Sequence, residues 1–283
     1  MIKDIVVNLS IRDARDPARD FAISTAAAFN AQLAGAHLAG MALLFEPLMS
    51  PMVDMYGIPP EVIESQRIEN EKLAKAAVAR FDESARRAGL KSADIPMLDA
   101  AVASASGLFA QVARRFDLSI VGQPEPDTAG LDRLIVEAAL FDSGRPVLVV
   151  PYIQRAGLRL DHVMLCWDGS RSAARAAGDA MPFIRRSKLV EVVIVGSEVA
   201  KSDEIRGADI ASHLARHGAK VELKRINTTE TDVAGIILSQ AADMSTDFMI
   251  MGGYGHSRLR EFILGGVTRE ILASMTVPVL MSH

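Results

Sequence analysis

Short apolar runs alternate with amphipathic stretches along the whole chain. The runs are mostly apolar along their full length, rather than at every second position. Continuous runs of this kind are typical of strands buried on both faces of a parallel sheet. They lie at residues 5–7, 37–44, 118–122 and 146–150 in the first half, and at residues 163–167, 189–195, 221–226, 248–251 and 278–281 in the second half.

Segments with a helical period fill the stretches between these runs. Residues 22–33 form one such segment, and residues 172–186 hold the corresponding place in the second half. A regular alternation of strand and helix predicts βαβ units, right-handed crossovers and a parallel sheet.

The chain also repeats itself. Gly122 and Gly252 each end a predicted strand and are 130 residues apart, while Pro146 and Pro278 each begin the next strand and are 132 residues apart. Such a long internal repeat indicates two copies of one α/β unit.

The repeat sets the predicted domain organisation. We expect one domain at residues 1–152 and a second at residues 160–283, with a polar linker between them. A length of 283 residues agrees with this division, because a domain takes about 150 residues.

The first copy carries a proline- and methionine-rich segment at residues 46–60, followed by a predicted long helix at residues 61–88. Methionine side chains adapt to irregular partners, so the segment is a candidate contact surface or lid. The alternative is a loop that packs over its own domain.

Charge and composition argue against a nucleic-acid-binding, disulfide-bonded or membrane-spanning protein. With 31 basic and 35 acidic residues the formal net charge is −4, which excludes a strongly basic nucleic-acid surface. The single cysteine, Cys166, cannot form an internal disulfide. No apolar run approaches the 18 or so residues of a membrane span, and no signal segment is recognisable. We therefore expect a cytoplasmic protein with no membrane segment.

The most informative local feature is the glycine-rich stretch at residues 252–268, which follows a predicted strand and runs into a helix. Glycines let backbone N–H groups approach a ligand, and a helix N-terminus favours anions. The stretch is therefore a candidate phosphate site. Ordinary tight turns with a glycine helix cap would explain the same residues.

Better-known phosphate motifs do not fit this stretch. Arg258 stands where a dinucleotide fingerprint requires its third glycine, and no Gly-Lys-Ser or Gly-Lys-Thr occurs in the chain. Without a phosphate-clamping lysine or an evident general base, the site is expected to hold phosphates rather than transfer them. Hydrolysis of phosphates held there is expected to be slow at most.

Asp168 follows the first predicted strand of the second copy. Ligands of open α/β sheets bind beyond the carboxyl ends of the strands, where Asp168 can accept hydrogen bonds from a ribose or a base. The alternative is that Asp168 caps the helix that begins near Arg171.

A metal site is not predicted. Asp209, His213 and His217 share one face of a predicted helix, but the zinc-protease motif needs a glutamate where Leu214 stands. His217 is better explained as a residue at the helix C-terminus. Cys166 is expected to behave as a small buried hydrophobe.

The spacing Gly252-x2-Gly255-x9-Gly265, with the opening Asp168-Gly169-Ser170, resembles the ATP-binding signature of the universal stress protein family. The resemblance covers both halves. It implies two tandem Rossmann-like (adenine nucleotide alpha hydrolase-like) domains, each an open five-stranded parallel sheet with helices on both faces.

The resemblance also implies roles for residues of the second copy. Asp168 would face the adenosine of ATP, with Mg²⁺ as a candidate companion ion. The phosphates would be wrapped by the glycine motif and its neighbours, with Arg258 as a further candidate contact: Gly252, Gly255, Gly265, Gly266, Val267 and Thr268.

This sequence departs from the family pattern at Gly266, where the family usually has Ser or Thr. The missing hydroxyl removes a hydrogen bond to a charged group, worth about 1.5–3 kcal/mol. Thr268 is a candidate replacement.

The first copy departs further. Ser10 replaces the acid, and Gln123, Pro124 and Glu125 follow Gly122 in place of Gly-x2-Gly. We predict that this copy binds no nucleotide. Its expected role is to pair with the second copy, through the last strands of each, as an internal pseudo-dimer.

The sequence thus predicts a universal stress protein that binds an adenine nucleotide in its C-terminal domain and acts in stress response or signalling, with an unidentified protein partner. The alternative is a nucleotide-independent interaction module that uses residues 46–60. Whether two chains also form a homodimer stays open.

Overall fold

Strands and helices alternate through the described part of the chain. The structure is a computed structural model that describes residues 2–12, 15–30, 37–45, 60–94, 98–100, 102–124, 129–196, 203–228, 232–253 and 266–283. The N-terminal half contains β1 (Asp4–Leu9), α1 (Pro17–Asn30), β2 (His37–Phe45), α2 (Pro60–Arg87), β3 (Ser92–Asp94), β4 (Leu98–Ala100), α3 (Val102–Ala113), β5 (Leu118–Gly122), α4 (Ala129–Phe141) and β6 (Val147–Val150). The C-terminal half contains β7 (His162–Cys166), α5 (Arg171–Asp179), α6 (Met181–Ile184), β8 (Leu189–Gly196), α7 (Asp203–Arg216), β9 (Val221–Asn227), α8 (Val233–Asp243), β10 (Phe248–Gly252), α9 (Gly266–Ser274) and β11 (Val279–Ser282).

Every apolar run that was predicted as a strand is a strand, with bounds within two residues of those expected. The predicted helix at residues 172–186 is broken into α5 and α6, and Pro182 lies in the first turn of α6. Residues 46–59 of the methionine-rich segment lie outside the described residues, and α2 begins directly after them at Pro60.

The described strands form one continuous sheet, and the expectation of a separate sheet for each half is wrong. The strand order is β3-β2-β1-β5-β6-β11-β10-β7-β8-β9, with β4 beside β2. All pairs within each half are parallel, whereas β6 and β11 pair antiparallel with Leu148 opposite Leu280. The sheets merge because both last strands are buried and apolar, and pairing satisfies the backbone groups of two otherwise open edges.

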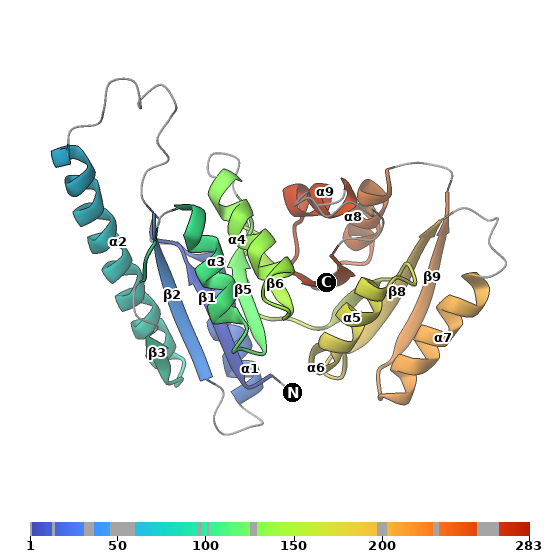
Figure 1. Cartoon of the computed structure of the whole chain (residues 1–283). Coiled ribbons are helices and arrows are strands. Elements are labelled where there is room, and N and C mark those ends of the chain that lie inside the picture. The colour runs from blue at the N-terminus through green and yellow to red at the C-terminus, as the bar shows by residue number, and fades with distance from the viewer. Residues whose placement is uncertain are drawn as a thin grey trace.

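This pairing confirms the predicted contact between the last strands of the two copies. Figure 1 shows β6 and β11 at the centre of the molecule, with the two halves extending to either side.

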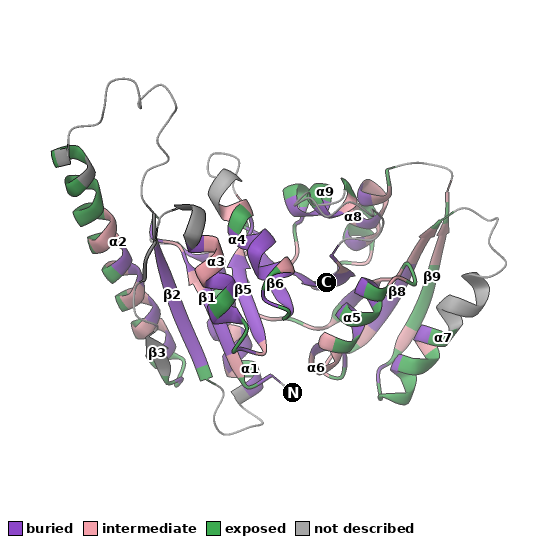
Figure 2. Ribbon diagram, in the orientation of Figure 1, coloured by how far each residue is buried: buried purple, intermediate pink, exposed green. Residues whose placement is uncertain are grey.

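Helices cover both faces of the sheet, as expected. One buried cluster combines side chains of α1, α2, α5, α6 and α7, and the other combines those of α3, α4, α8 and α9. Each cluster draws on both halves, so the core is continuous across the junction. Figure 2 shows the strands of the central sheet as mainly buried and the outer faces of the helices as exposed.

The first strand of each half, β1 or β7, is held at its start by an aspartate in the same way. Asp117 accepts hydrogen bonds from the backbone N–H groups of Lys3 and Asp4, at 2.8 and 3.2 Å. Asp247 does the same for Asp161 and His162, at 3.1 and 3.0 Å. Each aspartate therefore fixes the start of the first strand in its own half.

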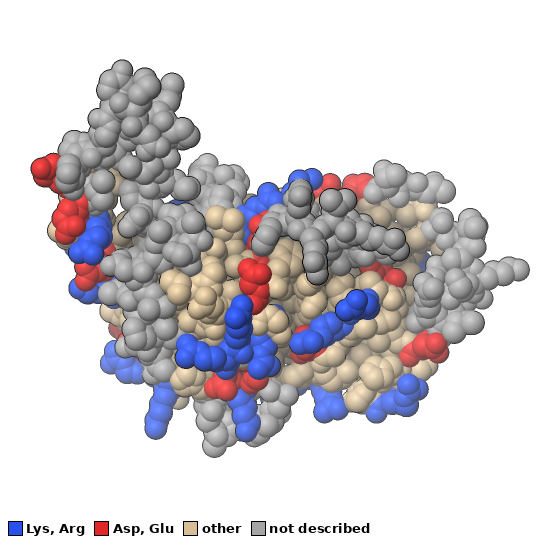
Figure 3. Space-filling model, in the orientation of Figure 1, with Lys and Arg blue, Asp and Glu red and all other residues tan. Residues whose placement is uncertain are grey.

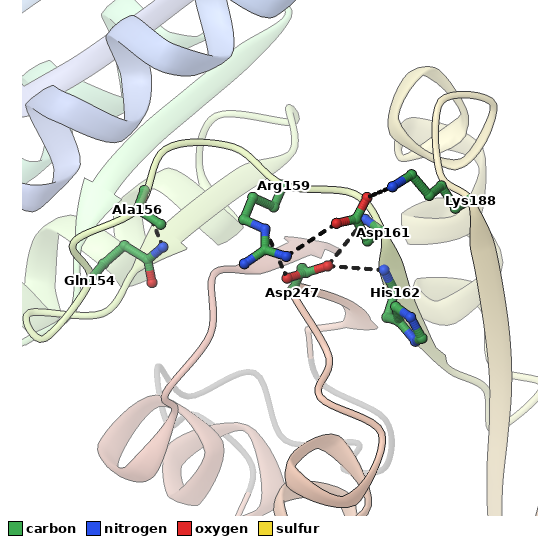
Figure 4. Close-up of polar contacts among 7 residues, drawn as sticks. All are labelled: Gln154, Ala156, Arg159, Asp161, His162, Lys188 and Asp247. Carbon is green, nitrogen blue, oxygen red and sulfur yellow. Dashed lines mark hydrogen bonds and ion pairs between the residues drawn. The ribbon is translucent and has the colours of Figure 1, made fainter.

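The linker between the halves is held by polar contacts, most of which are drawn in Figure 4. Arg159 lies 3.5 Å from Asp247 and 3.1 Å from Asp161, and Lys188 lies 2.7 Å from Asp161. Hydrogen bonds from Lys188 and Arg159 lower the pKa of Asp161. At its other end, Leu158 N–H donates to Ser24 Oγ of α1 at 2.9 Å. The linker is thus attached to both halves.

Among the described residues, none of the helices combines the length and apolar character needed to cross a bilayer.

Candidate functional site

The strand order of the C-terminal half reverses direction between β7 and β10. The chain proceeds outward from β7 to β8 and β9, then returns to the other side of β7 to form β10 and β11. In open α/β sheets, ligands bind at such a reversal, beyond the carboxyl ends of the strands. Both sequence features singled out as candidates follow these two strands.

The register brings the two features together. Ile250 of β10 lies opposite Leu165 of β7. β10 ends at Gly252 and β7 ends at Cys166, and Asp168 follows two residues after the end of β7. The predicted acid and the first glycine of the motif therefore lie at the carboxyl ends of two neighbouring strands.

Asp168 occupies a turn and is exposed. Its Oδ1 accepts a hydrogen bond from Ser170 N–H at 2.9 Å, and Gly169 adopts a left-handed φ of 73° that favours glycine. Within the described residues, its second carboxylate oxygen has no hydrogen-bond partner, so it can accept one from a ligand.

Ser170, rather than Asp168, caps α5. Its backbone is extended, and its Oγ accepts a hydrogen bond from Ala173 N–H at 3.1 Å. This is the usual geometry of an N-cap. The capping alternative for Asp168 is therefore wrong.

Gly252 allows the start of α5 to lie directly against the end of β10. A Cβ atom at Gly252 would lie 2.5 Å from Ala173 N and 2.7 Å from Ser172 C. Both are backbone atoms, which cannot move aside as the end of a flexible side chain can. Gly252 is thus required for packing, whatever binds beside it.

Gly253 has a similar role at the junction of the halves. A Cβ there would lie 2.7 Å from the side chain of Leu140 in α4. His283 also contributes, because its Nδ1 lies 3.1 Å from Gly253 O and its ring packs edge to face on Phe141.

The second part of the glycine motif enters α9. Gly266 is the first residue of the helix and is exposed, and a Cβ atom added there would meet no atom within 4 Å among the described residues beyond its chain neighbours. Val267 is partly buried and packs against the core. Thr268 is 4% exposed, so its side chain lies beneath the helix surface. Its role as a replacement hydroxyl stays a prediction.

The predicted contacts Gly255, Arg258 and Gly265 lie outside the described residues. Their roles also stay predictions.

Residues 159–283 match the universal stress protein family. These residues belong to that family. The glycine spacing and Asp168 predicted a resemblance to this family, and the match confirms it for the C-terminal half, which contains both features.

Comparisons with individual proteins extend this result. A universal stress protein of Synechocystis is 26% identical over 142 residues, which cover 48% of this chain and 46% of that protein, so the match spans about half of either length. A crystal structure of a universal stress protein from Archaeoglobus fulgidus covers 99% of this chain and 98% of its own, with a TM-score of 0.71 and 15% identity.

A protein of unknown function from Pseudomonas aeruginosa covers 99% of this chain and 92% of its own, with a TM-score of 0.61 and 14% identity. At these identities the likeness establishes the fold. The fold of the whole chain, both halves included, is therefore similar to that of the Archaeoglobus universal stress protein.

At the corresponding place in the N-terminal half, beyond the ends of β1 and β5, a buried carboxylate takes up backbone donors. Asp16 accepts hydrogen bonds from Ser10 N–H at 2.9 Å and from Arg19 N–H at 3.0 Å, the latter as the cap of α1. Burial raises the pKa of Asp16, although these two hydrogen bonds lower it. The backbone donor at Ser10 is thus already used within the protein.

A cavity of about 120 Å³ remains at this point, lined by Asn8, Arg12 and Gln123 among others. Asn8 Oδ1 is buried and has no hydrogen-bond partner among the described residues. Pro124 offers no N–H group. These features differ from a phosphate nest, and the expected lack of nucleotide in this half stays a prediction.

Cys166 lies beside the candidate site. Although the residue is half-buried, burial of its thiol, with a further contribution from the negative charge of Asp168, raises its pKa to about 12. The thiol therefore stays protonated near neutral pH, and the side chain packs against the core. This agrees with the expected hydrophobic role.

The histidines of α7 do not gather a metal site in the described part of the chain. The rings of His213 and His217 meet edge to face with centroids 4.7 Å apart, and Arg185 Nη2 lies 3.0 Å from His217 Nδ1. The described residues contain no group of three side chains suited to hold a metal ion.

Two contacts near the site were not foreseen from the sequence. Ser170 has an ordinary capping signature, because a serine directly precedes the helix, so this contact was within reach of sequence reasoning. Gln123 carries no such signature, because its partners lie about 150 residues away in α9.

Proposed function

We propose that the C-terminal half binds an adenine nucleotide, with ATP as the expected ligand, and that the protein acts in stress response or signalling rather than in catalysis. In this proposal residues 1–152 and 160–283 are two domains of one cytoplasmic protein, of which the second carries the nucleotide.

The observation that carries the proposal is the register of β7 and β10. It pairs the two strands that lead into Asp168 and the glycine motif, at the reversal point where open α/β sheets bind ligands, and one carboxylate oxygen of Asp168 has no hydrogen-bond partner among the described residues. A carboxylate there suits the hydroxyls of a ribose, and the glycine-rich chain that leaves β10 suits phosphates.

The start of α9 supports the same assignment. Gly266 is exposed at the helix N-terminus, where unpaired backbone N–H groups and the helix dipole favour negative charge. A bound Mg²⁺ would offset phosphate charge. The residues of this edge therefore suit a nucleotide with its cation.

The proposal favours binding over hydrolysis. The motif contains no phosphate-clamping lysine. Asp168 already accepts the Ser170 N–H with one oxygen, and we assign the other to the nucleoside rather than to an attacking water.

A second candidate function, a nucleotide-independent interaction module, is supported by α2. Its first turns, which follow the methionine-rich segment, are exposed and carry the apolar side chains Val62 and Ile68, which are 41% and 57% exposed. Charged pairs such as Arg67–Glu64 cover the rest of this surface, where Figure 3 shows mixed acidic and basic side chains. This candidate applies if the protein binds no nucleotide.

Gly266→Ser tests the proposal by a gain of affinity. The introduced Cβ meets no described atom within 4 Å, and the hydroxyl would supply a hydrogen bond to a charged phosphate. After the cost of ordering the side chain, we expect ATP to bind about fivefold more tightly. Calorimetric titration with ATP and Mg²⁺ measures the change.

Gly266→Ala is the matched control, because it adds the Cβ without the hydroxyl. It is expected to leave the affinity within about twofold of the original protein. Equal affinities of the serine and alanine variants would contradict a phosphate site at the start of α9.

A further inference from the structure

Gln123 joins the N-terminal half to the far end of α9. Its Nε2 donates hydrogen bonds to Leu272 O at 2.8 Å and to Ala273 O at 3.3 Å. Its Oε1 accepts one from Tyr152 N–H at 3.3 Å, and the residue is only 4% exposed. The amide therefore uses both its donor and its acceptor side in a buried position.

The two carbonyls belong to the last turn of α9, where helix carbonyls lack partners within the helix. The first turn of the same helix, at Gly266, is the end of the glycine motif. With nine residues, α9 is about 13 Å long. Because a helix this short moves as one rigid body, the contact of Gln123 with the last turn of α9 affects where the backbone N–H groups of its first turn lie.

Because the chain contains an internal repeat, the contact of Gln123 can be compared with that of the equivalent residue in the other half. Gln123 N–H donates to Val150 O at 2.8 Å, and Gly253 N–H donates to Ser282 O at 2.8 Å. Gln123 and Gly253 thus hold equivalent places in the two halves. Across the junction, Gln123 meets Leu272 of α9, and Gly253 meets Leu140 of α4, which is the equivalent residue.

The two equivalent contacts differ in kind. At Gly253 no side chain is present, and Leu140 packs directly against the backbone. At Gln123 a side-chain amide binds the helix end. The junction is therefore asymmetric, and of these two helices α9 is the one held in this way.

We propose that Gln123 is a positioning residue for the nucleotide site, through which the N-terminal half sets the affinity of the C-terminal half. This inference rests on the proposed function. Gln123 stands directly after Gly122, where the N-terminal half would otherwise begin its phosphate-binding turn. Instead, its side chain holds α9, the helix that we expect to contact the phosphates in the C-terminal half.

The test is a calorimetric ATP titration of the full chain and its variants, with Mg²⁺ present. Gln123→Ala removes the contact and is expected to weaken ATP binding about fivefold, within the usual range of coupling between sites. Gln123→Glu is expected to weaken it more, because a carboxylate would face two carbonyl oxygens.

Arg186→Ala is the matched control. Arg186 also donates from its side chain to a carbonyl of the other half, Ala28 O at 3.1 Å, and it lies over the ring of Phe29. It does not contact α9. We expect this variant to lower the urea midpoint of unfolding while leaving the ATP affinity unchanged.

A second measurement uses the unaltered protein. Coupling is reciprocal, so ATP is expected to stabilise the Gln123 contact and to slow hydrogen exchange at the Tyr152 amide. Tyr152 lies just after β6, in the N-terminal half. An unchanged exchange rate at saturating ATP would overturn the inference without any variant.

The outcomes separate the two proposals. If the unaltered protein binds no ATP, the proposed function fails and the inference fails with it. If it binds ATP and Gln123→Ala binds equally well, the inference alone is overturned. Equal losses in Gln123→Ala and Arg186→Ala would also overturn it, because the effect would then belong to the junction as a whole.

Discussion

Gly252→Ala is expected to lower the free energy of unfolding by about 1–3 kcal/mol and to weaken ATP binding strongly. The added Cβ would meet backbone atoms of Ser172 and Ala173 at less than 3 Å, so the start of α5 must move away from β10. Because α5 begins directly after the Asp168 turn, the same movement displaces the carboxylate from the glycine motif.

Urea denaturation and an ATP titration measure the two effects of this change. Gly266→Ala is the control, since it substitutes another glycine of the motif at a position where a Cβ meets nothing within 4 Å in the described part of the chain. We expect it to retain the original midpoint of unfolding. If Gly252→Ala proves as stable as the control, the close approach of α5 to β10 is wrong.

Asp168→Ala is expected to weaken ATP binding by about tenfold or more, because a ribose hydroxyl would lose a charged hydrogen-bond acceptor worth about 1.5–3 kcal/mol. The side chain is exposed, so stability should change little beyond the loss of the bond from Ser170 N–H. Calorimetry at fixed Mg²⁺ gives the affinity, and thermal unfolding without nucleotide gives the stability.

Asp168→Asn separates the turn from the ligand contact. Its amide oxygen can still accept the Ser170 N–H and hold the turn, but it lacks the charge. We expect the turn and the stability to be retained and the affinity to fall to an intermediate value. Unchanged ATP affinity in Asp168→Ala would remove this carboxylate from the site.

Much of the fold could be predicted from the sequence, because buried parallel strands leave a continuous apolar signal. This signal located β1, β2 and β5 to β11. It missed β3 and β4, which have three residues each and are too short to show any period. It also began α1 late, because the cap at Asp16 and the proline at the start of the helix were overlooked.

The single sheet could not be read from local pattern alone. The apolar strands at residues 147–150 and 279–282 indicated that the two edges pair. That one antiparallel pair merges two parallel sheets is a property of the assembled halves. It depends on contacts between residues about 130 positions apart.

The candidate site was predicted in part. Asp168 and Gly252 were each expected at the carboxyl end of a strand, and the two strands concerned, β7 and β10, lie side by side, while the binding roles of both residues stay predictions. The packing role of Gly252 and the contacts of Gln123 have no sequence signal, because both arise from long-range approach of backbone segments. The roles of Gly255, Arg258 and Gly265 stay predictions.

The most direct test of the central claim is the amount of nucleotide bound per chain. The freshly purified protein is denatured, released nucleotides are identified by mass, and an ATP titration with Mg²⁺ gives the stoichiometry. We expect about one adenine nucleotide per chain. No binding at millimolar ATP would contradict a nucleotide site in the C-terminal half, and two nucleotides per chain would contradict the loss of that site in the N-terminal half.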